Sequence, residues 1–293
     1  MRKGEGWFIS IARDGGMNMK IIKKIKANSV QILEVLMLIT VIFLPYILDI
    51  PSWFEDYLRD HKPEPEISNF LPYYILKAGN VAISLGLLFA VLIVIRRYNK
   101  EFVMNNDNVY HDYPFIWYWF CAKVLGIKKC NLILVPIYMQ FKLVIKNIFK
   151  DYPLDEMDFP VIEAEPECII EKKNMRADLS EINLILEDTY VIESNQIPFR
   201  KKSLPTVKIS RNTDNSHTRH FSPKFINSVS EEVRKFLTVS RVNIYATTNP
   251  MNTLRIARSA FKMADRGNIE HLFVYQQKRE GLRKFEQEGH RIY

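Results

Sequence analysis

The residues best suited to chemistry in this sequence are polar and basic side chains that could contact an anion. One group follows an apolar run at 241–246, and another follows an apolar run at 182–186. A third lies in a loop rich in histidine and arginine before residue 222. Hydroxyl, amide, imidazole and guanidinium groups are donors that bind phosphate and carboxylate oxygens. The candidate ligand-binding residues are Asp188, Thr189, Arg211, His217, Arg219, His220, Thr247, Thr248, Asn249 and Asn252.

These residues also have a purely structural interpretation. Thr248 and Asn249 are ordinary helix-capping residues. Asp188 suits the end of a strand, either as a catalytic carboxylate or as the cap of a turn. A loop with histidine and arginine is commonly a solvated loop. Contacts and burial in the folded chain distinguish the two interpretations.

Motifs of the familiar enzyme classes are absent from the sequence. It has no Walker loop, no G-x-S-x-G elbow and no H-E-x-x-H helix. The loop after 241–246 reads TTNPMN and has no glycine to let a pyrophosphate approach the backbone, which disfavours nicotinamide and flavin cofactors. His217 and His220 have no third ligand nearby, so we expect no metal. The sequence favours binding over catalysis and predicts no cofactor.

Short apolar runs alternating with capped helices predict an α/β domain to position these residues. The expected strands span 182–186, 206–210, 241–248 and 269–275. Ser222-Pro223 and Asn249-Pro250 each supply an N-cap and a first-turn proline for a helix, the second of which is expected to end at Gly267. Strand, helix and strand over 241–275 form a βαβ unit, whose strands are parallel. We therefore expect a three-layer domain with a parallel, Rossmann-like βαβ core.

Two apolar stretches, 30–50 and 71–95, are each long enough to cross a bilayer as a helix. Their few charged residues, such as Glu34, lie near the ends, within reach of the headgroups. Lysines and arginines cluster before the first stretch and after the second, and acidic residues dominate 51–70. By the positive-inside rule, both termini are cytoplasmic. A cleaved signal peptide is the competing interpretation, but no small-residue cleavage site follows the first stretch.

The region between the membrane spans and the α/β domain is aromatic and partly apolar. A helix is expected over 115–125, either in the membrane interface or packed on the soluble domain, and strands over 131–136 and 139–145. Acidic residues and prolines at 151–167 indicate a linker or an extended edge of the next domain. The predicted organisation is a basic N-terminus (1–28), a two-helix transmembrane hairpin (29–96), an aromatic membrane-proximal region (97–150), a linker (151–167) and a cytoplasmic α/β domain (168–293).

Composition narrows the candidate partners. The formal net charge is +8, concentrated beside the membrane spans and after residue 200, and attraction to anionic lipid accounts for much of it. Nucleic acid is a weaker partner, because no binding motif is present. Cys121, Cys130 and Cys168 are expected to be reduced thiols on the cytoplasmic side.

These patterns predict a bacterial cell-membrane protein whose cytoplasmic α/β domain binds or senses a ligand or partner, with a nucleotide or another anion as the candidate ligand. Its plan resembles, in architecture alone, that of membrane effectors of bacterial defence systems. One alternative is a structural subunit that meets other membrane proteins in a secretion or conjugation assembly. Another is a membrane-bound hydrolase. A polar pocket at the strand ends favours sensing or catalysis, and a flat apolar patch favours assembly.

Overall fold

A computed structural model describes residues 19, 21–53, 70–162, 165–175, 180–211, 219–262 and 269–293. Its contacts divide the chain into two compact units. The first unit comprises Met1–Val109 and Trp119–Lys128, and the second comprises Tyr110–Tyr118 and Lys129–Tyr293. The expected ligand-binding residues all belong to the second unit.

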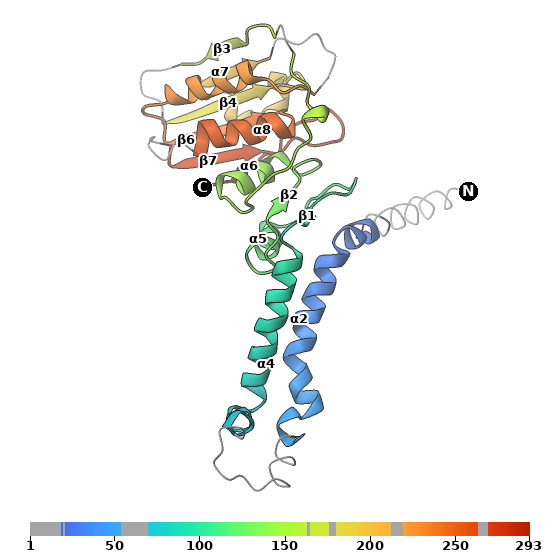
Figure 1. The fold of residues 1–293 in the computed structure, drawn as a ribbon. Helices are drawn as coiled ribbons and strands as arrows, with labels where there is room; N and C mark the ends of the chain where they lie inside the picture. The colour runs from blue at the N-terminus through green and yellow to red at the C-terminus, as the bar shows by residue number, and fades with distance from the viewer. Residues whose placement is uncertain are drawn as a thin grey trace, which may run out of the picture. The chain divides into compact units, whose positions relative to one another are not determined.

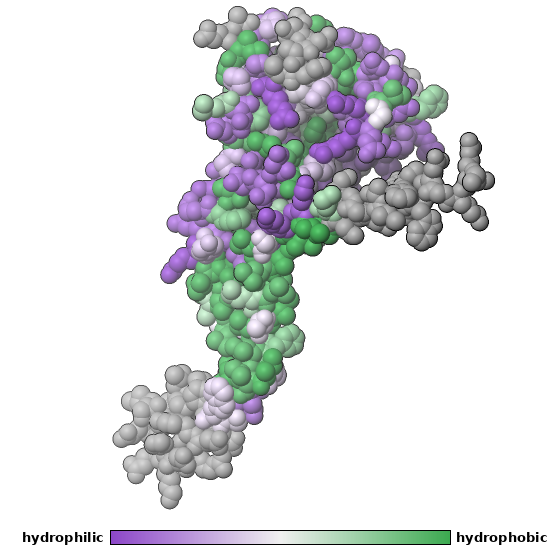
Figure 2. Space-filling view, turned by 90° about the vertical axis from the view of Figure 1, so that its right-hand side faces the viewer, coloured by the Kyte–Doolittle hydropathy of each residue, from purple (hydrophilic) through white to green (hydrophobic). Residues whose placement is uncertain are grey.

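The first unit is built on two long helices that pack against each other, α2 (Ser29–Leu48) and α4 (Phe70–Tyr98). The chain kinks within α4 at Gly79, where φ is 65°, a value that glycine adopts readily. Ser29–Leu48 and Gly79–Tyr98 are both long and apolar enough to cross a membrane. Their surface is mostly green in Figure 2, as expected for helices that face lipid. This agrees with the predicted two-span hairpin.

Polar side chains near the ends of these helices are paired within the first unit. The Asn99 side-chain amide donates to the carboxylate of Glu34 at 3.0 Å and to the carbonyl of Leu125 at 3.1 Å. We expected Glu34 to reach the headgroups, but it is buried, because Asn99 supplies the donor that a carboxylate needs away from water. Arg96 donates to two carbonyls at the end of α5 (Phe115–Lys123). Gly126 passes so close to Arg96 that an added Cβ would lie 2.8 Å from its side chain.

The second unit is built on a mixed six-stranded sheet with the order β3-β5-β4-β6-β7-β8 (Figure 1). The strands are β3 (Ile169–Lys173), β4 (Glu181–Glu187), β5 (Thr206–Ser210), β6 (Arg241–Ala246), β7 (His271–Tyr275) and β8 (His290–Arg291). The four central strands are parallel, and the edge strands β3 and β8 are antiparallel to their neighbours. All four predicted strands are present, as is the βαβ unit formed by β6, α8 and β7.

Two helices of this unit begin where the sequence predicts. The Ser222 hydroxyl accepts a hydrogen bond from the backbone of Phe225 at the start of α7 (Pro223–Arg234). The Asn249 side chain accepts one from Asn252 at the start of α8 (Pro250–Ile256), which continues as the π-helical η5 (Ala257–Lys262). The predicted end of this helix, Gly267, lies outside the described residues.

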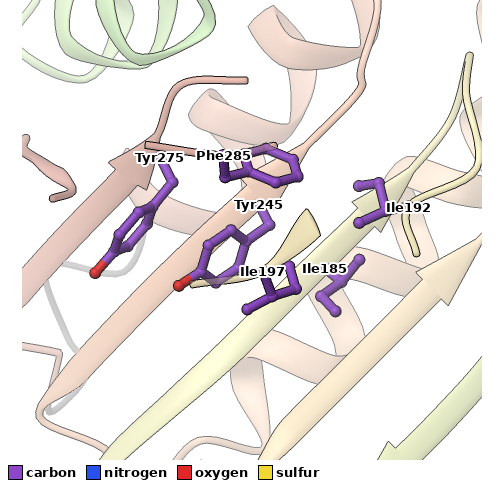
Figure 3. Close-up of a cluster of buried hydrophobic side chains, with 6 residues drawn as sticks. All are labelled: Ile185, Ile192, Ile197, Tyr245, Tyr275 and Phe285. Atoms are coloured by element: carbon purple, nitrogen blue, oxygen red, sulfur yellow. The ribbon is translucent and has the colours of Figure 1, made fainter. Parts of the chain in front are cut away.

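Helices α7 and α8 lie over one face of the sheet, and irregular segments cover the other (Figure 1). The connection from β4 to β5 contains only the short 3-10 helices η3 (Ser194–Gln196) and η4 (Phe199–Lys201), separated by Pro198. A proline in this position interrupts a regular helix. The expected three-layer, Rossmann-like domain is therefore not supported. The apolar cluster on the helix-free face consists of Ile185, Ile192, Ile197, Tyr245, Tyr275 and Phe285 (Figure 3).

The predicted strand over 139–145 is wrong, because this segment forms helix α6 (Ile137–Ile145). Its buried positions 139–141, 143 and 144 do not alternate as a strand would, and it packs against α8, η5 and β7. Residues 131–136, the other predicted strand, are irregular; the two-residue strands β1 (Val103–Met104) and β2 (Lys129–Cys130) precede them. Helix α5 confirms the helix predicted from residue 115. Helix α6 thus belongs to the same compact unit as the sheet.

The described part of 151–167 lies along the α/β sheet unit and includes the short 3-10 helix η2 (Glu156–Asp158). The side chains of Tyr152 and Phe159 are buried. The Phe221 backbone donates to the carbonyl of Pro160, and the Lys224 ammonium donates to the carbonyl of Glu165. The segment is therefore attached to the region where α7 begins.

Candidate anion-binding site

The carboxyl ends of β4 and β6 mark the point where the chain reverses direction across the sheet. From β4 the chain moves to β5 on one side, whereas β6 and β7 lie on the other side. The loops that leave β4 and β6 therefore diverge toward opposite faces. In open parallel sheets, such a switch point creates the crevice in which ligands bind. A cavity of about 440 Å³ lies here, within the usual size range of small-molecule sites.

The polar lining of this switch-point cavity is cationic, aromatic and amidic. Among the described residues, no aspartate or glutamate lines it. Within the same residues, its four cations form no ion pair with a carboxylate, so their charge is available to an anion. The cations are Arg219, Lys278, Arg279 and Arg283, the aromatic rings are Tyr110 and Tyr190, and the amides are Gln140, Asn249, Gln276 and Gln277; the hydroxyls of Thr189, Thr247 and Thr248 complete the polar lining.

Three of the cations lie on one hairpin, residues 276–286, which we term the arginine hairpin. Its two sides are joined by backbone hydrogen bonds from Lys278 to Lys284 and from Glu286 to Gln276. Phe285 anchors it, because this side chain is 1% exposed within the cluster on the helix-free face (Figure 3). The hairpin base is thus fixed to the core while its cationic side chains reach the cavity.

Both arginines of the hairpin rest on tyrosine rings. The guanidinium carbon of Arg279 lies 3.3 Å from the ring centre of Tyr110, and that of Arg283 lies 4.4 Å from the ring centre of Tyr190. Cation–π contacts of this kind hold the flat face of a guanidinium and leave donors at its edge. Those donors suit the oxygens of a phosphate, and a tyrosine ring suits a planar ring of a ligand.

Two lining residues hold an unusual backbone conformation. Six described non-glycine residues have positive φ, and four of them are asparagine or aspartate, which tolerate it. The other two, Leu134 (58°) and Arg283 (49°), both line the cavity. Strained backbone of this type concentrates at binding and catalytic sites.

Beneath the cavity lies a buried polar cluster centred on Asp188. One carboxylate oxygen accepts hydrogen bonds from the Asn249 backbone and side chain and from the Asn252 side chain, at 2.9–3.1 Å. The other faces the guanidinium of Arg211 at 3.0 Å. Burial raises the pKa of Asp188, while Arg211 and the amide donors act against that rise. Both amides also donate to the carbonyl of His220, which ties the loop before α7 to the start of α8.

The structure divides the sequence-predicted residues into two groups. Those that line the cavity are Thr189, Arg219, Thr247, Thr248 and Asn249. Those in the buried polar cluster beneath it are Asp188, Arg211, His220 and Asn252, with Asn249 shared between the two groups. His217 lies outside the described residues. Arg211 is 4% exposed and already paired, so its charge serves the fold, whereas exposed Arg219 remains a candidate for ligand contact.

Sequence reasoning did not single out the arginine hairpin or the two tyrosines. The hairpin follows β7 directly, so the rule that assigned the loops after β4 and β6 to the carboxyl edge also applies to QQKREGLRK. Tyr110 and Gln140 had no such signal, because they reach the cavity from segments that precede the sheet in sequence.

No group of three or more histidine, cysteine, aspartate or glutamate side chains that could hold a metal ion occurs among the described residues. The three cysteines form no disulfide with one another. Burial raises the pKa of the Cys121 thiol to about 12 and also raises that of Cys168, so both are neutral thiols near pH 7.

Fold and site together define a membrane protein with a two-helix transmembrane hairpin and a mixed α/β sheet unit that carries a cationic cavity at its switch point. Comparison with protein families identifies the family within this class. The chain belongs to the family described as the SMODS- and Ubiquitin system-associated 2TM effector domain, whose model matches residues 17–293. The comparison with curated proteins found no match.

Among solved structures, two matches are to the Cap4 SAVED/CARF-domain containing receptor of Acinetobacter baumannii. One holds the cyclic trinucleotide 3'3'3'-cAAA, with 8% identity over 54% of this chain and 37% of that chain and a TM-score of 0.36. The other holds 2'3'3'-cAAA, with 9% identity over 57% of this chain and 39% of that chain and a TM-score of 0.35. The chain thus spans less than two-fifths of either receptor.

Proposed function

We propose that this membrane effector senses an anionic ligand of the nucleotide class, which binds in the switch-point cavity of the α/β sheet unit. The observation that carries the proposal is the cavity lining, in which four cations and two tyrosine rings face a space without a described carboxylate. Phosphate groups would take the guanidinium donors, and a base would stack on a tyrosine ring.

The amides of the lining suit the polar edge of a base. Gln140 is 3% exposed, and its Nε2 donates to the Val135 carbonyl at 2.8 Å. Its Oε1 has no hydrogen-bond partner among the described residues. The Gln276 Oε1 accepts from the backbone of Ile137 at 3.1 Å, at the start of α6.

The family description supports the term effector for this chain, and the two apolar helices support a location in the membrane. As part of the proposal, the α/β sheet unit lies in the cytoplasm, because lysines and arginines precede the first span and follow the second, and such residues favour the cytoplasmic side. Ligand binding and membrane attachment would then reside in separate parts of one chain.

The experiment measures binding to the full chain in detergent by isothermal titration calorimetry. The probes are nucleoside triphosphates and cyclic dinucleotides, with unphosphorylated adenosine as the uncharged reference. We expect Arg279→Gln and Arg283→Gln each to weaken the binding of a phosphate-bearing probe by about 1–3 kcal/mol, the usual value of a charged hydrogen bond, or roughly 5- to 150-fold in Kd.

The matched control is Arg234→Gln, which removes an exposed arginine of α7 that does not line the cavity. It should leave Kd unchanged. If no phosphate-bearing probe binds, or if all three variants weaken binding equally, the sensing proposal fails and an interaction subunit becomes the better interpretation.

A further inference from the structure

Two elements of the first unit meet at one end of a candidate membrane span. The span Gly79–Tyr98 ends with the last turn of α4, and the C-terminal end of α5 lies beside that turn (Figure 1). The Arg96 guanidinium donates to the carbonyls of Lys123 and Val124 at 3.0 and 3.3 Å. Because charged side chains at the end of a span lie among the lipid headgroups, the end of α5 lies at headgroup level as well.

The junction of α4 with the end of α5 is tightly packed. The Asn99 amide donates to the carbonyl of Leu125 at 3.1 Å, and Asn99 is 0% exposed. Gly126 has a φ of 79°, and an added Cβ there would lie 2.8 Å from the Arg96 side chain. The cations at this junction therefore extend from backbone that is held in place by two helices.

One exposed face of α4 is apolar within the span and cationic at its end. Phe89, Ile93, Arg96 and Arg97 share this face, because they are spaced three, four, seven or eight residues apart. Phe89 is 62% exposed and Ile93 is 60% exposed, and both arginines are exposed. The face thus offers apolar contact to an acyl chain directly below two guanidinium groups.

Helix α5 adds an aromatic ring and a third cation at the same level. Trp119 is 41% exposed, and exposed Lys123 lies four residues further on, so the two side chains share a face of α5. Tryptophan is enriched where a protein crosses the membrane interface. Among the described residues, Arg96, Arg97 and Lys123 form no ion pair with a carboxylate. We term these three cations the basic corner.

We propose that the basic corner binds the phosphate of an acidic phospholipid, whose acyl chain lies along Phe89 and Ile93. Arg96 uses one guanidinium nitrogen to bond α5, which leaves its other donors for phosphate oxygens. A zwitterionic lipid carries its own cation, which the basic corner repels. Inorganic phosphate or a nucleotide has no acyl chain to use the apolar half of the face. This proposal does not depend on the sensing function assigned to the switch-point cavity.

The test uses native mass spectrometry of the full chain in a non-ionic detergent. The probes are phosphatidylglycerol and phosphatidylcholine with matched acyl chains, and the occupancy of each lipid is followed against its concentration. We expect phosphatidylglycerol to bind more tightly. Arg97→Gln and Lys123→Gln should each raise its Kd about 5-fold, which corresponds to about 1 kcal/mol for one cation near an anionic lipid surface. Arg96 is left intact, because it also holds α5.

The matched control is Lys26→Gln. Lys26 is exposed and precedes α2, and the bond between Glu34 and Asn99 places the start of α2 beside the end of α4. The control thus removes one cation at the same end of the hairpin but outside the basic corner, and it should leave the Kd for phosphatidylglycerol unchanged. An unchanged Tm in Arg97→Gln and Lys123→Gln excludes unfolding as the cause of their effect.

Three results would overturn this assignment. Equal affinity for the two lipids would remove the preference for an acidic headgroup. An equal loss of affinity in Lys26→Gln and Arg97→Gln would replace the site with diffuse attraction to the membrane surface. Displacement of phosphatidylglycerol by millimolar inorganic phosphate would show that the acyl chain contributes nothing, so that the ligand is a free phosphate rather than a lipid.

Discussion

Asp188 shows how one carboxylate can organise a site without contacting its ligand. Its two oxygens join residues from three loops, through Arg211 after β5 and through Asn249 and Asn252 around the start of α8. Asp188, Arg211, Asn249 and Asn252 are all buried. Removing one member therefore leaves charged or polar partners without water to replace it.

Asp188→Ala should lower the free energy of unfolding by about 3–5 kcal/mol, because it leaves the Arg211 guanidinium buried without its counter-charge. The measurement is chemical denaturation of the full chain in detergent, followed by circular dichroism. The double variant Asp188→Leu/Arg211→Met should recover much of the loss, since it removes both charges. A stable Asp188→Ala that has lost ligand affinity would instead make Asp188 a direct ligand contact.

Glu232 should contribute to the acid sensitivity of the sheet unit. Burial alone would raise its pKa, but hydrogen bonds from Lys172 and Lys235 outweigh burial and hold the pKa below its ordinary value of 4.5. A carboxyl group whose pKa is lower in the folded chain stabilises the fold at pH values above its unfolded pKa. This stabilisation is lost as the pH falls through the folded pKa. We expect Glu232→Gln to flatten the decline of Tm below pH 4.5. Glu171→Gln, which breaks an exposed pair with Lys173, is the control and should change little.

At the scale of elements, local signals in the sequence predict the sheet unit well. Ser222-Pro223 and Asn249-Pro250 specify helix starts through their own side chains, so no distant residue is needed. The parallel strands can likewise be predicted from the sequence, because each is a short apolar run. Helix α6 is different, because its β-branched and aromatic residues favour a strand and only packing against α8 and β7 makes it helical.

The same limit applies to the site. Thr247 and Thr189 could be placed at the carboxyl edge because each directly follows a strand. The contact of Arg279 with Tyr110 joins residues far apart in the chain, and no local pattern predicts such a pairing. Arg211 can be buried because it pairs with Asp188, and the sequence does not reveal this contact. The sequence alone therefore predicted that Arg211 binds the ligand.

Helix α6 sets the smallest fragment that we expect to fold. A fragment of residues 168–293 lacks α6 and so loses the packing of Phe141 against Phe261, whose ring centres are 6.1 Å apart. It should be less stable and more prone to aggregation than residues 129–293, because the surface of α8 and η5 that α6 covers becomes exposed. Thermal denaturation and size-exclusion chromatography of both fragments make the comparison. Equal behaviour would place α6 outside the cooperative core.

At the scale of the whole molecule, the charge pattern predicts the orientation of the hairpin. A reporter inserted in the loop at 51–70 should be accessible from outside, and one after Tyr293 should be accessible only from the cytoplasm, because lysines and arginines flank the spans on that side. Protease or alkylating reagents applied to intact cells provide the measurement. An external C-terminus would reverse the hairpin and exclude a cytoplasmic ligand.

The arginine hairpin has a consequence for how such proteins diverge. Its base is anchored by Phe285, whereas Lys278, Arg279 and Arg283 are exposed side chains on a surface connection. Surface loops accept substitutions and changes of length with little effect on the sheet that supports them. Selection for a new chemical signal can therefore change the residues at the tip of this hairpin while the buried cluster around Asp188 stays constant. Homologous effectors that differ most in the sequence of this segment should accordingly differ most in the signal that they prefer.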